Sequence, residues 1–187
     1  MSEMEQWIHA AAKGEMGAFR KIYDHYLGQV TRTVGRYLGP GPAVEDVVQE
    51  VFVQLHGSLN GVSDVDAFGG WVYRISRNVA ISHLRKQKSS VDFVTLKMVK
   101  EPTSQWRRLA AREQVRALYA ALDCLSAEQR EAVIMYEIEG HTLQEIADLT
   151  DTSINTIASR VRRGRQQLIK LLERVLSGST DKEKEQA

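Results

Sequence analysis

The chain has 187 residues, a hydrophobic content of 43% and a formal net charge of +1 at pH 7. This composition excludes a globally disordered chain, and the length suffices for one domain or two small ones. No apolar run reaches membrane-spanning length and the start lacks a signal-peptide core, so we expect a soluble, cytoplasmic protein without membrane insertion.

Helical periodicity dominates the first half of the chain. We expect helices around residues 7–11, from about 16 to 38, over 43–55, and from Phe68 or Trp71 to about 85. The Gly-Pro-Gly-Pro turn at residues 39–42 ends the second of these helices. Residues 57–70 are predicted to form a loop because of their glycine, serine and aspartate content.

The helix predicted over residues 43–55 has one apolar stripe and one acidic face. Asp46 and Glu50 lie four residues apart on that face, so two like charges meet on the helix surface. One interpretation is that the carboxylates complement the helix dipole and are otherwise solvated. The other is a docking surface for a basic partner. This stretch alone leaves both interpretations open.

Two basic patches stand on the near-neutral chain. Residues 67–88 contain five cations and no carboxylate, and residues 153–174 contain six cations and only Glu173. Local patches of this kind favour phosphate binding. In the first patch Trp71 and Tyr73 accompany the arginines, a mixture that suits single-stranded nucleic acid, although Trp71 alone also fits a core position.

The helical period is lost over residues 88–105. A short strand over 91–96 is possible, but no partner strand is evident, which favours a linker. We therefore predict an all-α protein of two small helical domains joined by a flexible linker, the second domain containing a helix-turn-helix. The predicted boundaries are 1–88 for the first domain, 89–106 for the linker, 107–175 for the second domain and 176–187 for a disordered tail.

The second half carries clear helix-start signals. A helix over about 107–122 is followed by capping boxes at Ser126–Gln129 and Thr142–Glu145, which open helices to about 138 and 149. Asp151 sits in a turn that calls for a left-handed residue, and a last helix runs from Ser153 to about 172. Its predicted buried stripe consists of Ile154, Ile157, Val161, Leu168 and Leu171.

The last two helices form a predicted helix-turn-helix. Outward residues near the start of the second helix would enter the major groove, where arginine suits guanine and asparagine suits adenine. These residues are Ser153, Asn155, Thr156, Ser159, Arg160 and Arg163. The competing interpretation is an ordinary helical hairpin with a solvated basic face.

Enzyme chemistry finds no support in the sequence. Cys124 is the only cysteine, and the five histidines are scattered without metal-ligand spacing. No phosphate-cradling glycine loop or nucleophile elbow occurs. We expect no catalytic residue, metal, cofactor or small-molecule substrate.

Three motifs in order resemble the extracytoplasmic-function (ECF) sigma factors. VEDVVQEVF resembles region 2.2 of that family, WVYRISRNVAISHLRK resembles regions 2.3 and 2.4, and the stretch from LSAEQREAV to RRGRQQL resembles region 4. The resemblance covers nearly the whole chain apart from the linker and the tail. It implies a sigma factor that directs RNA polymerase to promoters; a stand-alone helix-turn-helix regulator is the alternative, but would not need the acidic face.

The resemblance also implies roles for individual residues. Asp46, Gln49 and Glu50 match positions that dock on the polymerase β′ clamp. The minus-ten element would be contacted by Trp71, Arg74, Arg77, Asn78, Arg85 and Lys86, with the loop at 58–68 capturing a flipped-out base. The six outward residues of the last helix would contact the minus-thirty-five element. The implied partners are core RNA polymerase through its β′ clamp and β flap, promoter DNA and an anti-sigma factor. The target promoters and the inducing signal are not specified.

Overall fold

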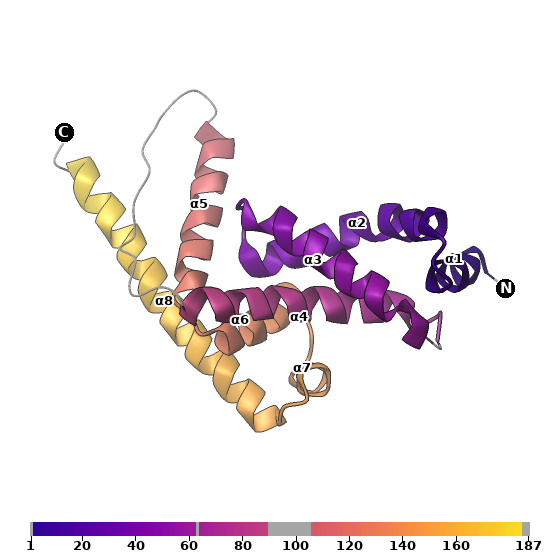
Figure 1. Cartoon of the computed structure of the whole chain (residues 1–187). Helices are drawn as coiled ribbons and strands as arrows, with labels where there is room; N and C mark the ends of the chain where they lie inside the picture. Colours follow the sequence, from indigo (N-terminus) through magenta and orange to yellow (C-terminus); the bar gives the residue numbers. More distant parts are fainter. Residues whose placement is uncertain (1, 63, 90–105, 185–187) are drawn as a thin grey trace. The chain divides into compact units, whose positions relative to one another are not determined.

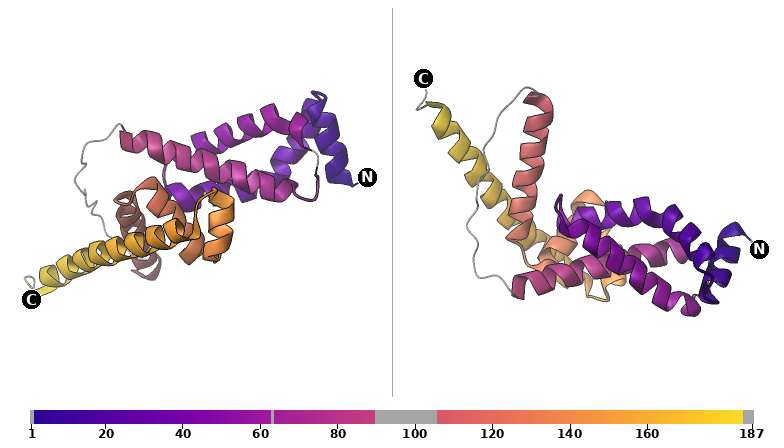
Figure 2. Two further views of the ribbon diagram at one scale, coloured as in Figure 1. Left: turned by 90° about the horizontal axis from the view of Figure 1, so that it is seen from below. Right: turned by 45° about the horizontal axis from the view of Figure 1, so that its top comes forward.

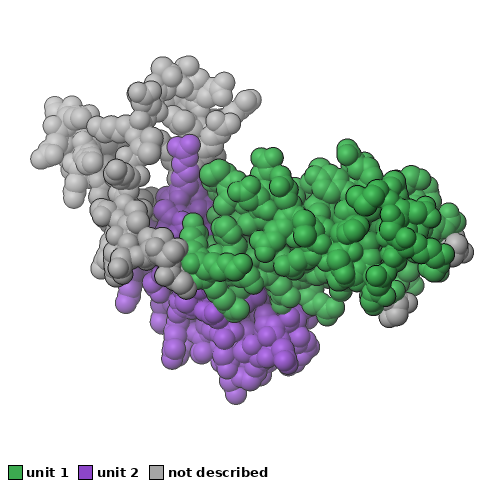
Figure 3. Space-filling view, viewed as in Figure 1, with its two compact units in different colours: residues 1–87 green, residues 88–187 purple. Residues whose placement is uncertain are grey.

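The computed structural model describes residues 2–62, 64–89 and 106–184, and this part of the chain is all-α (Figure 1). The chain divides into two compact units, residues 1–87 and 88–187, which Figure 3 distinguishes by colour. The alternative strand and all but the two end residues of the predicted linker lie outside the described residues. Ser89 ends one helix and Trp106 begins the next.

The first unit contains four α-helices and a short 3₁₀ turn. These elements are α1 (Glu3–Ala12), α2 (Met16–Leu38), α3 (Ala43–Ser58), η1 (Leu59–Gly61) and α4 (Phe68–Ser89). The four helices lie where the sequence predicts them, and α2 ends at Gly39, whose φ of 81° breaks the helix ahead of Pro40. Figure 2 shows α2 and α3 running side by side.

The apolar stripe of α3 forms much of the core of the first unit. Val47, Val51 and Leu55 are almost fully buried and lie at helical spacing on one side of α3. Burying such side chains contributes about 1.5–3 kcal/mol each, which fixes the rotation of the helix about its axis. The acidic face of α3 is therefore turned to solvent.

The loop predicted over residues 57–70 is shorter than the sequence indicates. Helix α3 continues to Ser58, η1 follows, and α4 already begins at Phe68. Leu59 is 2% exposed and Phe68 is 1% exposed, so both ends of the predicted loop are anchored in the core. This burial overrides the turn-forming composition, because propensity is a weaker determinant than packing.

The second unit contains α5 (Trp106–Asp123), α6 (Ala127–Val133), a π-helical segment (Ile134–Ile138), α7 (Leu143–Thr150) and α8 (Ile154–Lys184). The single helix predicted over 127–138 thus changes to π geometry in its last five residues. Helix α8 extends beyond residue 172 to Lys184, so the disordered tail predicted over 176–187 is helical as far as Lys184. Serine and glycine at 177–179 do not stop this helix, because they weaken helix propensity without blocking the backbone as proline would.

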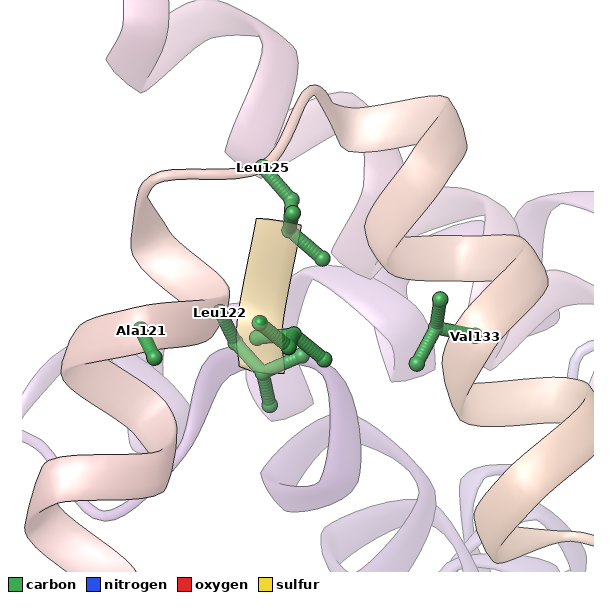
Figure 4. Packing of buried hydrophobic residues seen from close by; sticks show 5 residues of the cluster. Ala121, Leu122, Leu125 and Val133 are labelled. Atoms are coloured by element: carbon green, nitrogen blue, oxygen red, sulfur yellow. The ribbon is translucent and has the colours of Figure 1, made fainter. Parts of the chain in front are cut away.

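Helix α8 packs against the other helices of the second unit. Figure 4 shows part of the core where α5, α6 and α8 meet; it consists of Ala121, Leu122, Leu125, Val133 and Leu168. Gly164 of α8 faces α6 so closely that a Cβ atom there would lie 2.7 Å from Val133 Cγ2. The crossing of α6 and α8 therefore requires a residue without a side chain.

Local hydrogen bonds fix the start of α7 and the turn after it. Both predicted capping boxes are confirmed, with Ser126 paired to Gln129 and Thr142 paired to Glu145. Asp151 adopts the predicted left-handed conformation, with φ 50° and ψ 48°. These contacts set the direction in which α8 leaves α7.

Candidate nucleic-acid interface

The acidic face of α3 is an exposed stripe. Asp46, Gln49 and Glu50 are all exposed, and their side chains form no hydrogen bond or ion pair within the described part of the chain. Carboxylates in the first turn of a helix are favoured by its dipole, and Glu45 and Asp46 occupy that turn. Glu50 lies beyond it, so the helix dipole does not account for the whole stripe.

Val53 continues this stripe, and the sequence interpretation missed it. Its side chain is 71% exposed and lies three residues after Glu50, on the same side of α3. The helical spacing of residues 46, 49, 50 and 53 could have shown that Val53 lies on the acidic side of the helix. The surface consequently combines negative charge with an exposed apolar group, a combination that suits a partner protein better than solvent alone.

Helix α4 presents a basic stripe on its solvent face. Arg74, Asn78, Arg85 and Lys86 are exposed, and Trp71 is half-buried at the start of the same face. Three-, four-, seven- and eight-residue separations place these residues along one side of the helix. Five of the six predicted minus-ten residues therefore share one surface.

Arg77 is the sixth, and it lies off this stripe. Its Nη2 donates a hydrogen bond of 2.9 Å to Oδ1 of Asn78. The guanidinium of Arg77, which is buried with 4% exposure, thus bonds to the amide of an exposed neighbour.

Trp71 stands at the end of a chain of aromatic contacts. Its ring lies 5.4 Å from the ring of Phe68, which lies 5.4 Å from the ring of Tyr26. Burial raises the pKa of Tyr26 above its ordinary value of 10.0. Trp71 is therefore supported by the core on one side and open on the other, so each sequence interpretation of this residue describes part of it.

The segment before α4 is held by a short turn. Oδ1 of Asp64 accepts hydrogen bonds from the backbone N–H groups of Asp66 and Ala67, at 3.0 and 3.2 Å. Gln29 Nε2 donates to the carbonyl oxygen of Gly69 at 3.3 Å, which ties the first turn of α4 to α2. The predicted base-capturing loop thus ends on a fixed helix start.

At the start of α8, three of the predicted minus-thirty-five residues already make hydrogen bonds within the helix. Ser153 Oγ accepts from the backbone N–H of Thr156 at 3.2 Å and lies 2.8 Å from its hydroxyl oxygen. Ser159 donates to the carbonyl oxygen of Thr156 at 2.9 Å. Asn155 and Arg163 are exposed, and Arg160 is half-exposed. Asn155, Arg160 and Arg163 are therefore the side chains with the greatest freedom to reach a ligand.

Ile154 departs from its predicted place in the buried stripe. It is 42% exposed, whereas Ile157 and Val161 are buried as expected. Ile154 is the first residue of α8, so no preceding turn of the helix helps to cover it. Periodicity predicts the side of a helix but not how far its neighbours extend along it.

Arg165, another cation of the second basic patch, is used within its own unit. Its Nε donates to Oε1 of Glu137 at 2.8 Å, and its guanidinium lies 5.9 Å from the ring centre of Tyr136. The hydrogen bond to Glu137 and the negative charge of Glu137 raise the pKa of Arg165 above its ordinary value. The pair joins the π-helical segment to α8.

The described residues offer little support for a metal site or a membrane span. No group of three or more histidine, cysteine, aspartate or glutamate side chains there could hold a metal ion. Among the described helices, none combines the length and apolar character needed to cross a membrane.

Comparisons with known proteins match the two halves of the chain separately. The family profile described as Sigma-70 region 2 matches residues 22–90, and that described as Sigma-70, region 4 matches residues 115–168. The chain is 28% identical over 172 residues to the ECF RNA polymerase sigma-E factor of Escherichia coli strain K12, covering 86% of this chain and 90% of the relative. The corresponding protein of Haemophilus influenzae is 23% identical over the same length.

Two solved structures share the fold. CnrH, in complex with the cytosolic domain of CnrY, aligns with a TM-score of 0.58 at 23% identity, covering 92% of this chain and 98% of that one. The sigma factor RpoE of Bartonella quintana, in complex with the anti-sigma factor NepR, aligns with a TM-score of 0.54 at 24% identity, covering 83% and 96%.

Proposed function

Because the chain belongs to the ECF branch of the sigma-70 family, we propose that its two units divide the work of promoter recognition. As an alternative sigma factor, the protein directs core RNA polymerase to a specific set of promoters and initiates transcription there. The sigma-70 family acts in transcription initiation and is not a family of catalysts, so we assign this chain no catalytic residue and no cofactor. Its place of action is the cytoplasm, where polymerase and promoters meet.

One observation carries the proposal: the first unit exposes an acidic stripe on α3 and a basic stripe on α4. A protein that only bound DNA would gain nothing from unneutralised carboxylates, because they repel phosphate. A protein that bridges DNA and a basic partner protein uses both. This argues against the stand-alone helix-turn-helix regulator.

We assign the acidic stripe to the polymerase. Asp46, Gln49 and Glu50 would face basic residues of the β′ clamp, while the second unit would meet the β flap. Charge complementarity of this kind mainly sets specificity and the association rate, and it adds affinity where the pairs are desolvated.

We assign the basic stripe of α4 to the opened minus-ten strand. Trp71 would stack on a base, Arg74, Arg85 and Lys86 would neutralise phosphates, and Asn78 would contact a base. The start of α8 would read the minus-thirty-five duplex, with Asn155, Arg160 and Arg163 as the base-reading side chains and Ser153, Thr156 and Ser159 fixing the helix start or meeting phosphates.

Regulation by an anti-sigma factor completes the proposal. RpoE of Bartonella quintana has been solved with the anti-sigma factor NepR, and CnrH with the cytosolic domain of CnrY. A fold shared along most of the chain supports an analogous partner here, one that covers the polymerase-binding surface.

The test is run-off transcription by core polymerase and this chain on a genomic library, together with core binding by a charge-reversed variant. Asp46→Lys with Glu50→Lys should weaken core binding by at least about 2 kcal/mol, or about thirtyfold, while circular dichroism stays helical. The control, Glu3→Lys with Glu15→Lys, makes the same change of charge elsewhere on the first unit and should bind normally. Wild-type affinity in the first variant would remove α3 from the docking surface. A library without a single active promoter would refute the sigma function itself.

A further inference from the structure

Helix α2 carries a further basic stripe on its solvent face, which the sequence interpretation missed. Its members follow Lys21 at separations of four, seven, eleven and fifteen residues, so they share one side of the helix, and all of them are exposed. They are Lys21, His25, Gly28, Arg32 and Arg36. Neutral residues separate these cations along the chain, so no dense run of charge announced the α2 stripe.

Helix α2 itself supplies no carboxylate to this face. Asp24 is the only acidic residue of the helix, and it is paired with Arg20 on another side. Arg20 Nε donates to both carboxylate oxygens of Asp24, at 3.0 and 3.1 Å. Arg32 and Arg36 lie four residues apart, where two like charges cost a little stability. An anion bound along the α2 stripe would relieve this repulsion.

The α2 stripe adjoins the start of the basic stripe on α4. Gln29, at its edge, donates from Nε2 to the carbonyl oxygen of Gly69 in the first turn of α4, at 3.3 Å. The rings of Tyr26 and Phe68 are 5.4 Å apart, and the same separation joins Phe68 to Trp71. The two basic surfaces of the first unit therefore meet near Trp71.

We infer that the α2 stripe is a second single-strand surface of the first unit, which holds phosphates of the opened promoter strand beyond the base at Trp71. This rests on the proposed function, which assigns Trp71 to a base of that strand. Arginine binds phosphate through parallel hydrogen bonds, and lysine binds it as a point charge. Contacts of this kind supply affinity and fix the path of the strand, but they carry no base preference.

The composition of the α2 stripe favours nucleic acid over an acidic protein. None of its members is apolar, whereas the acidic stripe of α3 includes the exposed Val53. An aromatic ring also lies at one end of it: Lys21 Nζ is 5.6 Å from the ring centre of Trp7, and the ring of His25 is 6.3 Å away. Cations beside aromatic rings are typical of surfaces that bind single strands.

The experiment measures binding of the full chain with core polymerase to promoter fragments whose minus-ten segment is already single-stranded, over a range of salt concentrations. Each phosphate contact to a single strand contributes about 0.7 to the slope of log affinity against log salt. Arg32→Gln with Arg36→Gln should therefore reduce the slope by about 1.4. Binding should weaken about 25-fold at about 0.1 M salt, and the affinities extrapolated to 1 M should agree. The loss should be the same for every sequence.

A cation of the same helix provides the matched control. Arg20→Gln removes a charge that is paired with Asp24 on another side of α2, so it should leave the slope unchanged, whereas Arg32→Gln alone should reduce it by about 0.7. Glutamine and arginine have similar helix propensities, so circular dichroism should stay helical in each variant. Binding to an intact minus-thirty-five duplex should be unaffected, because the second unit reads it.

Each outcome bears on the inference. An unchanged slope in the double variant would overturn it and leave the sigma function intact. Weaker binding to core polymerase in the absence of DNA would assign the α2 stripe to a protein partner and also overturn it. A loss confined to particular minus-ten sequences would mean a base contact in place of phosphate contacts. Failure of the wild-type holoenzyme to bind any pre-melted promoter would overturn the proposed function as well.

Discussion

The two units hold their exposed residues in place by different means. In the first unit, α2 and α3 are 23 and 16 residues long, and neither has a side-chain hydrogen bond at its N-terminus. In the second unit, α6 and α7 have only 7 and 8 residues, and each begins with a capping box. Short helices are marginal by themselves, whereas long amphipathic ones are held by their buried faces. Packing therefore orients α3, whereas local caps fix the short helices α6 and α7 that precede α8.

The largest effect should come from the tight crossing of α6 and α8. Gly164→Ala places a Cβ atom 2.7 Å from Val133 Cγ2 and should destabilise the second unit by about 2 kcal/mol. Gly35→Ala in α2 meets nothing within 4 Å and should stabilise the first unit by about 0.5–1 kcal/mol. Hydrogen exchange resolved by helix measures both. If both substitutions stabilised their units, the crossing of α6 and α8 would be able to relax around the added methyl group.

Promoter binding provides the next test of the division between the units. Arg163→Ala should weaken binding to an intact minus-thirty-five duplex by about 1–3 kcal/mol if it contacts a base. If it contacts only phosphate, the loss should be similar on all sequences and the salt slope should fall by about one.

Asn78→Ala is the matching change in the first unit. It should leave duplex binding nearly unchanged and reduce open-complex formation, and a pre-melted promoter should not restore the lost base preference. Fluorescence anisotropy for duplex binding and permanganate footprinting for opening distinguish the two variants. Equal losses of duplex binding in both would contradict the division.

Removing a helix cap should have a smaller effect, confined to the second unit. Thr142→Ala removes the hydroxyl that accepts from Glu145 N–H at 3.2 Å, and it should destabilise this unit by about 1 kcal/mol. Glu15→Ala, at the uncapped start of α2, should change stability by less than about 0.5 kcal/mol. Chemical denaturation measures both, and a larger loss at Glu15 would reverse the comparison.

The smallest effect is a pH dependence of the same cap. Hydrogen bonds from the backbone and hydroxyl of Thr142 lower the pKa of Glu145 below its ordinary value of 4.5. A lowered pKa in the folded state means that the carboxylate stabilises the fold above the ordinary pKa, and that this contribution is lost as the pH falls through the lowered value. Glu145→Gln can form the same box without a charge, so the stability difference between variant and wild type should shrink as the pH falls below the ordinary pKa of 4.5. A difference that stays constant from pH 7 to pH 3 would assign no role to the charge.

Much of the second unit was predictable from sequence because its signals are local. The capping boxes at Ser126 and Thr142 and the left-handed Asp151 each depend on a few neighbouring residues. The apolar stripe of α3 was predictable for the same reason, since helical spacing alone defines it. The assigned roles of the exposed residues came from family resemblance and stay predictions.

What the sequence did not reveal depends on contacts between distant segments or between side chains. The anchoring of Leu59 and Phe68 shortened the predicted loop, and the exposure of Ile154 depends on how far its neighbours reach. The hydrogen bond from Arg77 to Asn78 depends on rotamers that periodicity does not specify. Exposed Val53 was visible in the spacing, but an apolar residue beside three polar ones did not suggest a shared surface.

The π-helical segment Ile134–Ile138 affects the direction in which the chain continues after α6. The N–H of Glu139 bonds to the carbonyl oxygen of Ile134, five residues earlier, so this turn contains one residue more than an α-helical turn. Deleting one residue here would let the turn close as regular α-helix, because the π turn accommodates the extra residue locally, and the side chains of the turn would then point in new directions. The bond from Arg165 to Glu137 would then fall out of register, because Glu137 lies within the turn. The length of this turn therefore matters as much as the identity of its side chains for the contact between this segment and α8.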